Sequence, residues 1–154
     1  MNELAARAEA LQQAYAGIVC TRMAGLPLVH PRLKVATVDF RADAQGDTAL
    51  GVLLTPWCMN LVRLPLRDGM PMLAVGERGT RDIGSRRFDF IGAHEAGVGG
   101  FEACSLFSPM FEFADQAAAL ATAQQALKAL RTLQQPAQPA RRGFLFGRSP
   151  GASA

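Results

Sequence analysis

Residues 48–64 read T-A-L-G-V-L-L-T-P-W-C-M-N-L-V-R-L and contain the pattern that decides the fold. Ala49–Leu54 is apolar at nearly every position, which predicts a central strand buried on both faces. Pro56 has no amide hydrogen to give to a sheet ladder, so the strand should break or bulge there. Trp57–Leu64 then predicts the next strand. Two strands joined by so short a break should be antiparallel neighbours.

Side chains of this second strand should alternate between the two faces of the sheet. One face would carry Cys58, Val62 and Leu64, and the other Trp57, Met59 and Leu61. If both helices of the chain cover one face, the stripe with Trp57 and Met59 is an exposed patch. An aromatic and methionine patch of this kind suits adaptable binding of partner proteins. The alternative is that the stripe packs in the core.

The flanking sequence predicts more strands of the same sheet, at Leu33–Phe40, Met72–Val75, Arg86–Ala93 and Phe101–Phe107. In the first of them, Ala36, Val38 and Phe40 would line one face. A polar turn around Gly46 joins it to the central strand as a hairpin. The charged, glycine-rich segment Gly76–Gly84 predicts an exposed turn.

Apolar residues at three- and four-residue spacing predict two helices, one at each end of the chain. The first covers residues 2–23, and the second starts after the N-cap Asp115 and ends near Gln135, before Pro136. We therefore expect an α+β fold in two layers, a mostly antiparallel sheet of about five or six strands flanked by N- and C-terminal helices. Residues 1–135 form the domain, and residues 136–154 are predicted to be a flexible Arg/Pro/Gly tail.

The composition indicates a folded protein rather than a membrane or nucleic-acid-binding one. Of the 154 residues, 49% are hydrophobic and 19% are charged, and no apolar run approaches the length of a membrane span. The first ten residues lack the basic start and apolar stretch of a secretory signal, so we expect a cytoplasmic protein without membrane insertion.

The net charge of +3 is concentrated in the tail. Without Arg141, Arg142 and Arg148, the rest of the chain has 13 basic and 13 acidic residues. A nucleic-acid-binding fold usually carries a basic face, so no nucleic-acid partner is expected. The tail either meets an acidic patch on a partner or is simply solvated.

Residues with catalytic or metal-binding chemistry are few and scattered. His30 and His94 do not form a motif, and each is interpreted as structural or exposed rather than catalytic. The three cysteines Cys20, Cys58 and Cys104 lack any C-x-x-C spacing, which favours reduced, packed thiols and no cofactor. A nucleophilic Cys104, or a metal shared by Cys58 and Cys104, remains an alternative.

Several short motifs together resemble the HybE/HupJ/HoxT family of accessory proteins for [NiFe]-hydrogenase assembly. In order, they are His30-Pro31, Asp39-Phe40, Thr55-Pro56-Trp57, Cys104-Ser105-Leu106 with Ser108-Pro109-Met110, and Arg141-Arg142-Gly143-Phe144-Leu145-Phe146-Gly147-Arg148. The resemblance spans nearly the whole chain.

The resemblance implies a non-catalytic cytoplasmic chaperone. It would bind the small or large precursor subunit of a hydrogenase and delay twin-arginine export until the cofactors are in place. A rubredoxin partner would have to be a separate protein, because the chain lacks paired C-x-x-C motifs. The predicted partner-binding residues are Thr55, Pro56, Trp57, Met59, Cys104, Ser105, Leu106, Ser108, Pro109, Met110, Arg141, Arg142, Phe144, Phe146 and Arg148. The competing hypothesis is a cysteine-based redox or iron-handling protein acting in the same assembly process.

Overall fold

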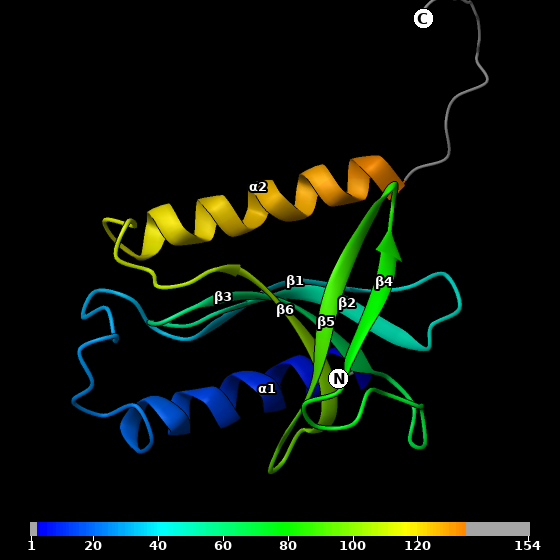
Figure 1. Cartoon of the computed structure of the whole chain (residues 1–154), viewed down its shortest axis with the longest axis horizontal. Helices are drawn as coiled ribbons and strands as arrows, with labels where there is room; N and C mark the ends of the chain where they lie inside the picture. The colour runs from blue at the N-terminus through cyan, green and yellow to red at the C-terminus, as the bar shows by residue number, and fades with distance from the viewer. Residues whose placement is uncertain (1–2, 135–154) are drawn as a thin grey trace, which may run out of the picture.

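The computed structural model describes residues 3–134 and contains two helices and six strands within them (Figure 1). The elements are α1 (Glu3–Cys20), β1 (Ala36–Ala42), β2 (Thr48–Leu54), β3 (Met59–Pro65), β4 (Arg78–Ile83), β5 (Arg86–Glu95), β6 (Gly99–Phe107) and α2 (Gln116–Gln134). This order confirms the predicted α+β fold with a helix at each end. The Asp115 cap is also confirmed, since the amide of Ala118 donates to its Oδ1 at 2.9 Å.

All six strands form one antiparallel sheet in the order β1-β2-β3-β6-β5-β4. Every pair of neighbours in the sheet is consecutive in the chain except β3 and β6. The segment between those two contains the β4–β5 hairpin, which extends the sheet to its second edge. The sheet therefore has β1 at one edge and β4 at the other.

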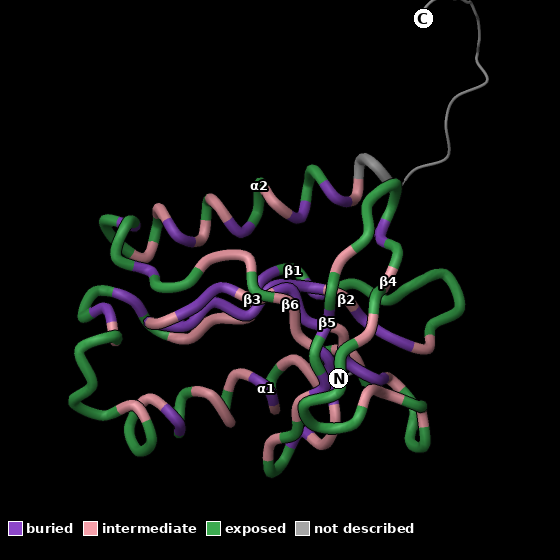
Figure 2. Tube along the Cα trace, viewed as in Figure 1, coloured by how far each residue is buried: buried purple, intermediate pink, exposed green. Residues whose placement is uncertain are grey.

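The two helices lie on opposite faces of the sheet, so the domain has three layers rather than the expected two (Figure 1). On the α1 side, Leu11 packs in a core that also contains Phe40, Ala49, Leu53, Val62, Leu64, Val98 and Phe101. On the α2 side, Ala123 and Leu127 pack with a core that includes Val52, Leu54, Met59, Leu61 and Phe90. Because both faces are covered, β2 and β3 are mostly apolar and buried, and Figure 2 shows them as the buried centre of the sheet.

The prediction that Val38 and Phe40 share one face of the sheet is wrong, because β1 contains a bulge. The register with β2 shifts between Val38 and Arg41, and Asp39 has a φ of 50°. Val38 then points into the α2-side core and Phe40 into the α1-side core, instead of sharing one face. Gly51 is required here because a Cβ would collide with the ring of Phe40.

The edge strand β4 lies where the sequence predicted a turn, and Met72–Val75 is not a strand. The sequence did not predict β4 because its residues are exposed or half-buried, and only Ile83 at its end is buried. The strand therefore lacks the apolar alternation that indicates a strand. Val75 instead makes a single parallel bridge to Gly92. Gly92 has to lack a side chain, because the carbonyls of Leu73 and Ala74 pass directly over it.

Candidate functional site

Three loops meet at one end of the molecule, on the left in Figure 1. We call this surface the loop end and define it as residues 21–35, 55–58 and 108–115. It contains most of the motifs that the sequence singled out. The side chain of His30 forms a hydrogen bond there with the backbone of Phe113, which lies 83 residues further along the chain.

His30 is buried and holds the three loops together. Its backbone amide donates to the carbonyl of Pro56 at 2.9 Å, and its Nδ1 accepts from the amide of Arg32 at 3.1 Å. Since Nδ1 is the acceptor, Nε2 carries the proton and donates to the carbonyl of Phe113 at 2.7 Å. Both ring nitrogens are therefore occupied. The structural interpretation of His30 fits this geometry better than an acid–base role.

Thr55 shapes the turn between β2 and β3. Its Oγ1 accepts from the amide of Cys58 at 2.9 Å and donates to the carbonyl of Cys58 at 3.0 Å. Thr55 is fully buried, and Pro56 is buried with it. These two residues set the backbone of the turn and present no side-chain surface to a partner.

The predicted stripe of Trp57, Met59 and Leu61 is a core feature rather than an exposed patch. Met59 and Leu61 are fully buried against the α2-side core. Trp57 precedes β3 and stacks on Tyr15 of α1, with ring centroids 6.3 Å apart. The alternative that the stripe packs in the core is confirmed for Met59 and Leu61, because a helix covers each face of the sheet. Trp57 stays half-exposed at the loop end.

The segment from Cys104 to Met110 divides between core and surface. Cys104 and Leu106 are half-buried against the α2-side core, and Met110 is fully buried. Ser105, Ser108 and Pro109 are exposed, and the peptide bond between Ser108 and Pro109 is cis. Within this segment, Ser105, Ser108 and Pro109 are therefore the residues most accessible to another protein.

Three large apolar side chains at the loop end are exposed, and the sequence analysis missed all three. Leu26 is 44% exposed, Leu28 53% and Phe111 51%. The ring of Phe111 stacks on His30 at 5.8 Å, so the buried histidine supports it from beneath. A signal was available: each of these residues sits in a proline-flanked loop, where no strand or helix alternation could bury it.

An apolar groove continues this surface along α1. It has a volume of about 310 Å³ and lies between the helix and the segment before β1. Its lining includes Ala16, Val19, Leu33 and Val35. The loop end thus has exposed apolar side chains beside an apolar groove. Exposed apolar surface of this kind is typical of protein-binding sites.

The thiols are poorly placed for metal or nucleophilic chemistry. Burial raises the pKa of Cys58, and burial together with the charge of Asp89 raises that of Cys104. Cys58 lies on the α1 side, near Tyr15, whereas Cys104 packs against the α2-side core. A single metal ion cannot bind both. Within residues 3–134, no three histidine, cysteine or carboxylate side chains are grouped closely enough for a metal.

Burial also raises the pKa of Tyr15, which lies next to Trp57 of the loop end. Its pKa is raised to about 12, first by burial and then by the nearby charge of Glu95. The phenol therefore stays protonated at neutral pH and serves as a packing surface for Trp57 and Phe101.

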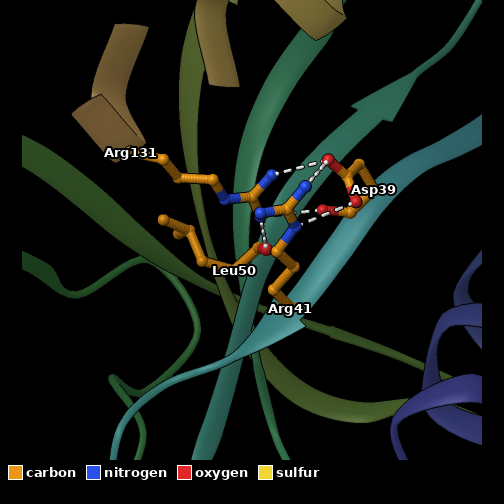
Figure 3. Close-up of polar contacts among 4 residues, drawn as sticks. All are labelled: Asp39, Arg41, Leu50 and Arg131. Carbon is orange, nitrogen blue, oxygen red and sulfur yellow. Dashed lines mark hydrogen bonds and ion pairs between the residues drawn. The ribbon is translucent and has the colours of Figure 1, made fainter. Parts of the chain in front are cut away.

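The opposite end of the sheet holds a polar hollow that we call the arginine groove. It has a volume of about 230 Å³ and is lined by Arg41, Ala42, Asp43, Thr48, Leu50 and Arg131. Arg131, from α2, donates to the Asp39 carboxylate at 2.9 Å and to the carbonyls of Asp39 and Leu50 at 2.8 and 2.9 Å. Figure 3 shows Arg41 reaching the same carboxylate. Arg131 thereby connects α2 to the β1 bulge through hydrogen bonds.

Charges around the arginine groove are matched within the molecule. Burial lowers the pKa of Arg131, and Asp39 opposes that effect. Burial alone would raise the pKa of Asp43, but hydrogen bonds from Thr48, Asp47 and Gly46 lower it. Beside the groove, Glu102 is fully buried and accepts from Arg63, from Arg81 and from the amide of Leu73. These donors outweigh burial and lower the pKa of Glu102.

Comparison with known proteins identifies the family. A family model described as "[NiFe]-hydrogenase assembly, chaperone, HybE" matches residues 6–147. The chain belongs to the HybE family of [NiFe]-hydrogenase assembly chaperones. It is 42% identical to the protein HoxT of Cupriavidus necator, over 92% of this chain and 89% of that protein. It is 39% identical to the hydrogenase expression/formation protein HupT of Azotobacter chroococcum, over 92% and 95%.

A solved structure shares the HybE fold. The solution structure of HybE from Escherichia coli matches with a TM-score of 0.66 and 24% identity, covering 95% of this chain and 92% of that one. Neither α1 nor α2 combines the length and hydropathy needed to cross a membrane, within the residues that the structure describes. The predicted tail contacts Arg141, Arg142, Phe144, Phe146 and Arg148 lie outside the described residues.

Proposed function

We propose that this HybE-family chaperone binds a precursor subunit of a [NiFe]-hydrogenase through its loop end. Binding would hold the precursor in the cytoplasm and delay twin-arginine export until cofactor assembly is complete. The observation that carries the proposal is the trio Leu26, Leu28 and Phe111, exposed on loops that His30 fixes in place.

The loop end has the features of a protein-binding hot spot. Such surfaces use a few large apolar or aromatic anchors that lose their contact with water on binding. Phe111 is half-exposed, and its ring already rests on the ring of His30. Trp57 and the exposed Pro109 border the same surface. A preformed frame lowers the entropy cost of ordering the anchors when a client binds.

A binding role without catalysis suits the chemistry of the site. Both ring nitrogens of His30 are engaged in hydrogen bonds within the fold. The raised pKa values of Cys58 and Cys104 keep these thiols protonated and weakly nucleophilic at neutral pH. Neither feature supplies a base or a nucleophile at the surface.

Other partners would join through other parts of the chain. The tail arginines Arg141, Arg142 and Arg148, with Phe144 and Phe146, would add a second contact on an acidic patch of the client. A rubredoxin, if one takes part, would be a separate protein, because this chain has no C-x-x-C pair.

The proposal is tested by purifying the tagged chain from hydrogenase-producing cells and identifying the bound proteins by mass spectrometry. Recovery of a hydrogenase subunit that still carries its signal peptide is the expected result. Recovery of the chain without any hydrogenase subunit contradicts the proposal.

The surface is tested by a double substitution, Leu28→Asp with Phe111→Asp, in the same purification. Both side chains are exposed, so folding should survive, while recovery of the client should fall at least about tenfold. Val75→Asp is the matched control, since Val75 is 74% exposed but lies outside the loop end. Client recovery with the control should equal that of the unmodified chain.

A further inference from the structure

The two edges of the sheet differ in how their backbone hydrogen bonds are used. At the edge formed by β1 and the residues before it, side chains from both helices cover the outward backbone groups. The Gln116 amide accepts from the Lys34 amide at 3.0 Å and donates to the Lys34 carbonyl at 3.1 Å. Gln12 accepts from the amide of Thr37 at 3.0 Å.

Arg131 completes the cover of this edge by donating to the carbonyl of Asp39 at the bulge. A strand edge that is bulged and occupied by side chains cannot pair with another strand. The β1 edge is therefore closed to further sheet growth.

In the part of the chain that the structure describes, the outer side of β4 is not paired with another strand. Within residues 3–134, Arg78–Ile83 pairs with β5 alone and stands last in the strand order. The helix α2 comes near β4 at Ile83, whose side chain belongs to the α2-side core. Arg78, Thr80 and Asp82 are exposed on one face of this edge. Figure 1 shows β4 at the rim of the sheet, in the hairpin that rises toward the end of α2.

The sequence of β4 is complementary to itself when two copies run antiparallel. We propose that β4 of one copy pairs with β4 of a second copy of this chain, centred on Thr80, and joins the two sheets into one. In this register, Arg78 of each copy lies opposite Asp82 of the other, and the two Thr80 residues face each other. Opposite-charge and threonine pairs are favourable cross-strand neighbours.

Further features of the molecule support this partner. Asp82 already accepts from Arg87 of its own hairpin at 3.0 Å, which holds its carboxylate on the exposed face. Because the β1 edge is closed, pairing through β4 must stop at a two-fold dimer and cannot continue into a filament. The loop end stays accessible in such a dimer, so the inference is independent of the proposed client binding.

Two charge reversals, Arg78→Asp in one chain and Asp82→Arg in another, test the proposal by sedimentation. The intact chain should show a concentration-dependent monomer–dimer equilibrium. Each variant alone places like charges opposite each other twice, so its self-association should be at least about tenfold weaker. An equimolar mixture restores opposite charges at both positions, and the heterodimer should form with the affinity of the unmodified chain.

The mixture is also the control for folding, because it contains the same two chains with the same intramolecular contacts. Arg32→Asp makes the same charge change at the loop end and should leave the dimer intact. A chain that is monomeric at all concentrations up to about 1 mM overturns the proposal. So does a mixture that associates no better than its separate components.

Discussion

The loop end and the arginine groove lie at opposite ends of one sheet and differ in which side chains face solvent. At the loop end, a polar residue, His30, is buried so that apolar residues can face solvent. At the arginine groove, long polar side chains satisfy charges and backbone carbonyls inside the molecule. Charges that are already paired offer little to a partner, whereas exposed apolar groups gain free energy when covered. We therefore propose that the loop end binds the client and that the arginine groove stabilises the fold.

The largest effect on stability is expected from His30→Ala. This change leaves the carbonyl of Phe113 and the amide of Arg32 without their partner, so the free energy of unfolding should fall by about 3 kcal/mol. Chemical denaturation measures the loss. His94→Ala is the matched control, since His94 is exposed, and it should cost no more than about 0.5 kcal/mol. Equal effects of the two substitutions would contradict the role given to His30.

A smaller effect is expected from Glu102→Gln, near the arginine groove. Arg63 and Arg81 lose a buried carboxylate but keep some contact with water, so the loss in unfolding free energy should be about 2 kcal/mol at neutral pH. Because the folded-state pKa of Glu102 is lowered, its contribution is complete above an unfolded pKa of about 4.3 and disappears as pH falls through the folded pKa.

The pH dependence distinguishes this account from a simple packing defect. The difference in unfolding free energy between the unmodified chain and the Glu102→Gln variant should shrink below a pH of about 4. Denaturation curves measured between neutral and acidic pH provide the comparison. A difference that stays constant over the whole range would show that the carboxylate charge is not what stabilises the cluster.

The smallest effect is expected from Arg131→Met. The substitution keeps the aliphatic packing but removes three hydrogen bonds to Asp39 and Leu50, whose oxygens can then bind water. The unfolding free energy should fall by about 1 kcal/mol. Arg41→Met is the control, since Arg41 is well exposed and, within residues 3–134, pairs with Asp39 alone, so its effect should be close to zero. Client recovery should be unchanged in both variants.

Sequence reasoning was reliable where a local pattern determines the outcome. The apolar run Ala49–Leu54 did become a central strand covered on both faces, and Asp115 did cap the second helix. It was unreliable where the outcome depends on which face each helix covers. The stripe of Trp57, Met59 and Leu61 could be assigned to surface or core only after the helices were found on opposite faces.

Other features required long-range contacts that no local pattern reveals. The β1 bulge sends Val38 and Phe40 to different cores, although their spacing predicts one face. The strand β4 has too few buried side chains to be read from alternation. The loop end forms because His30 makes hydrogen bonds to Pro56 and Phe113. These residues lie far apart in the sequence, so no local pattern predicts the contacts.

We propose that the client contacts the loop end and not the arginine groove. A photoreactive benzoylphenylalanine can replace Phe111 in one chain and Arg41 in another, and both can be irradiated in hydrogenase-producing cells. We predict a covalent adduct with a hydrogenase precursor subunit from the position of Phe111 and none from that of Arg41. An adduct formed from the position of Arg41 alone would contradict the account.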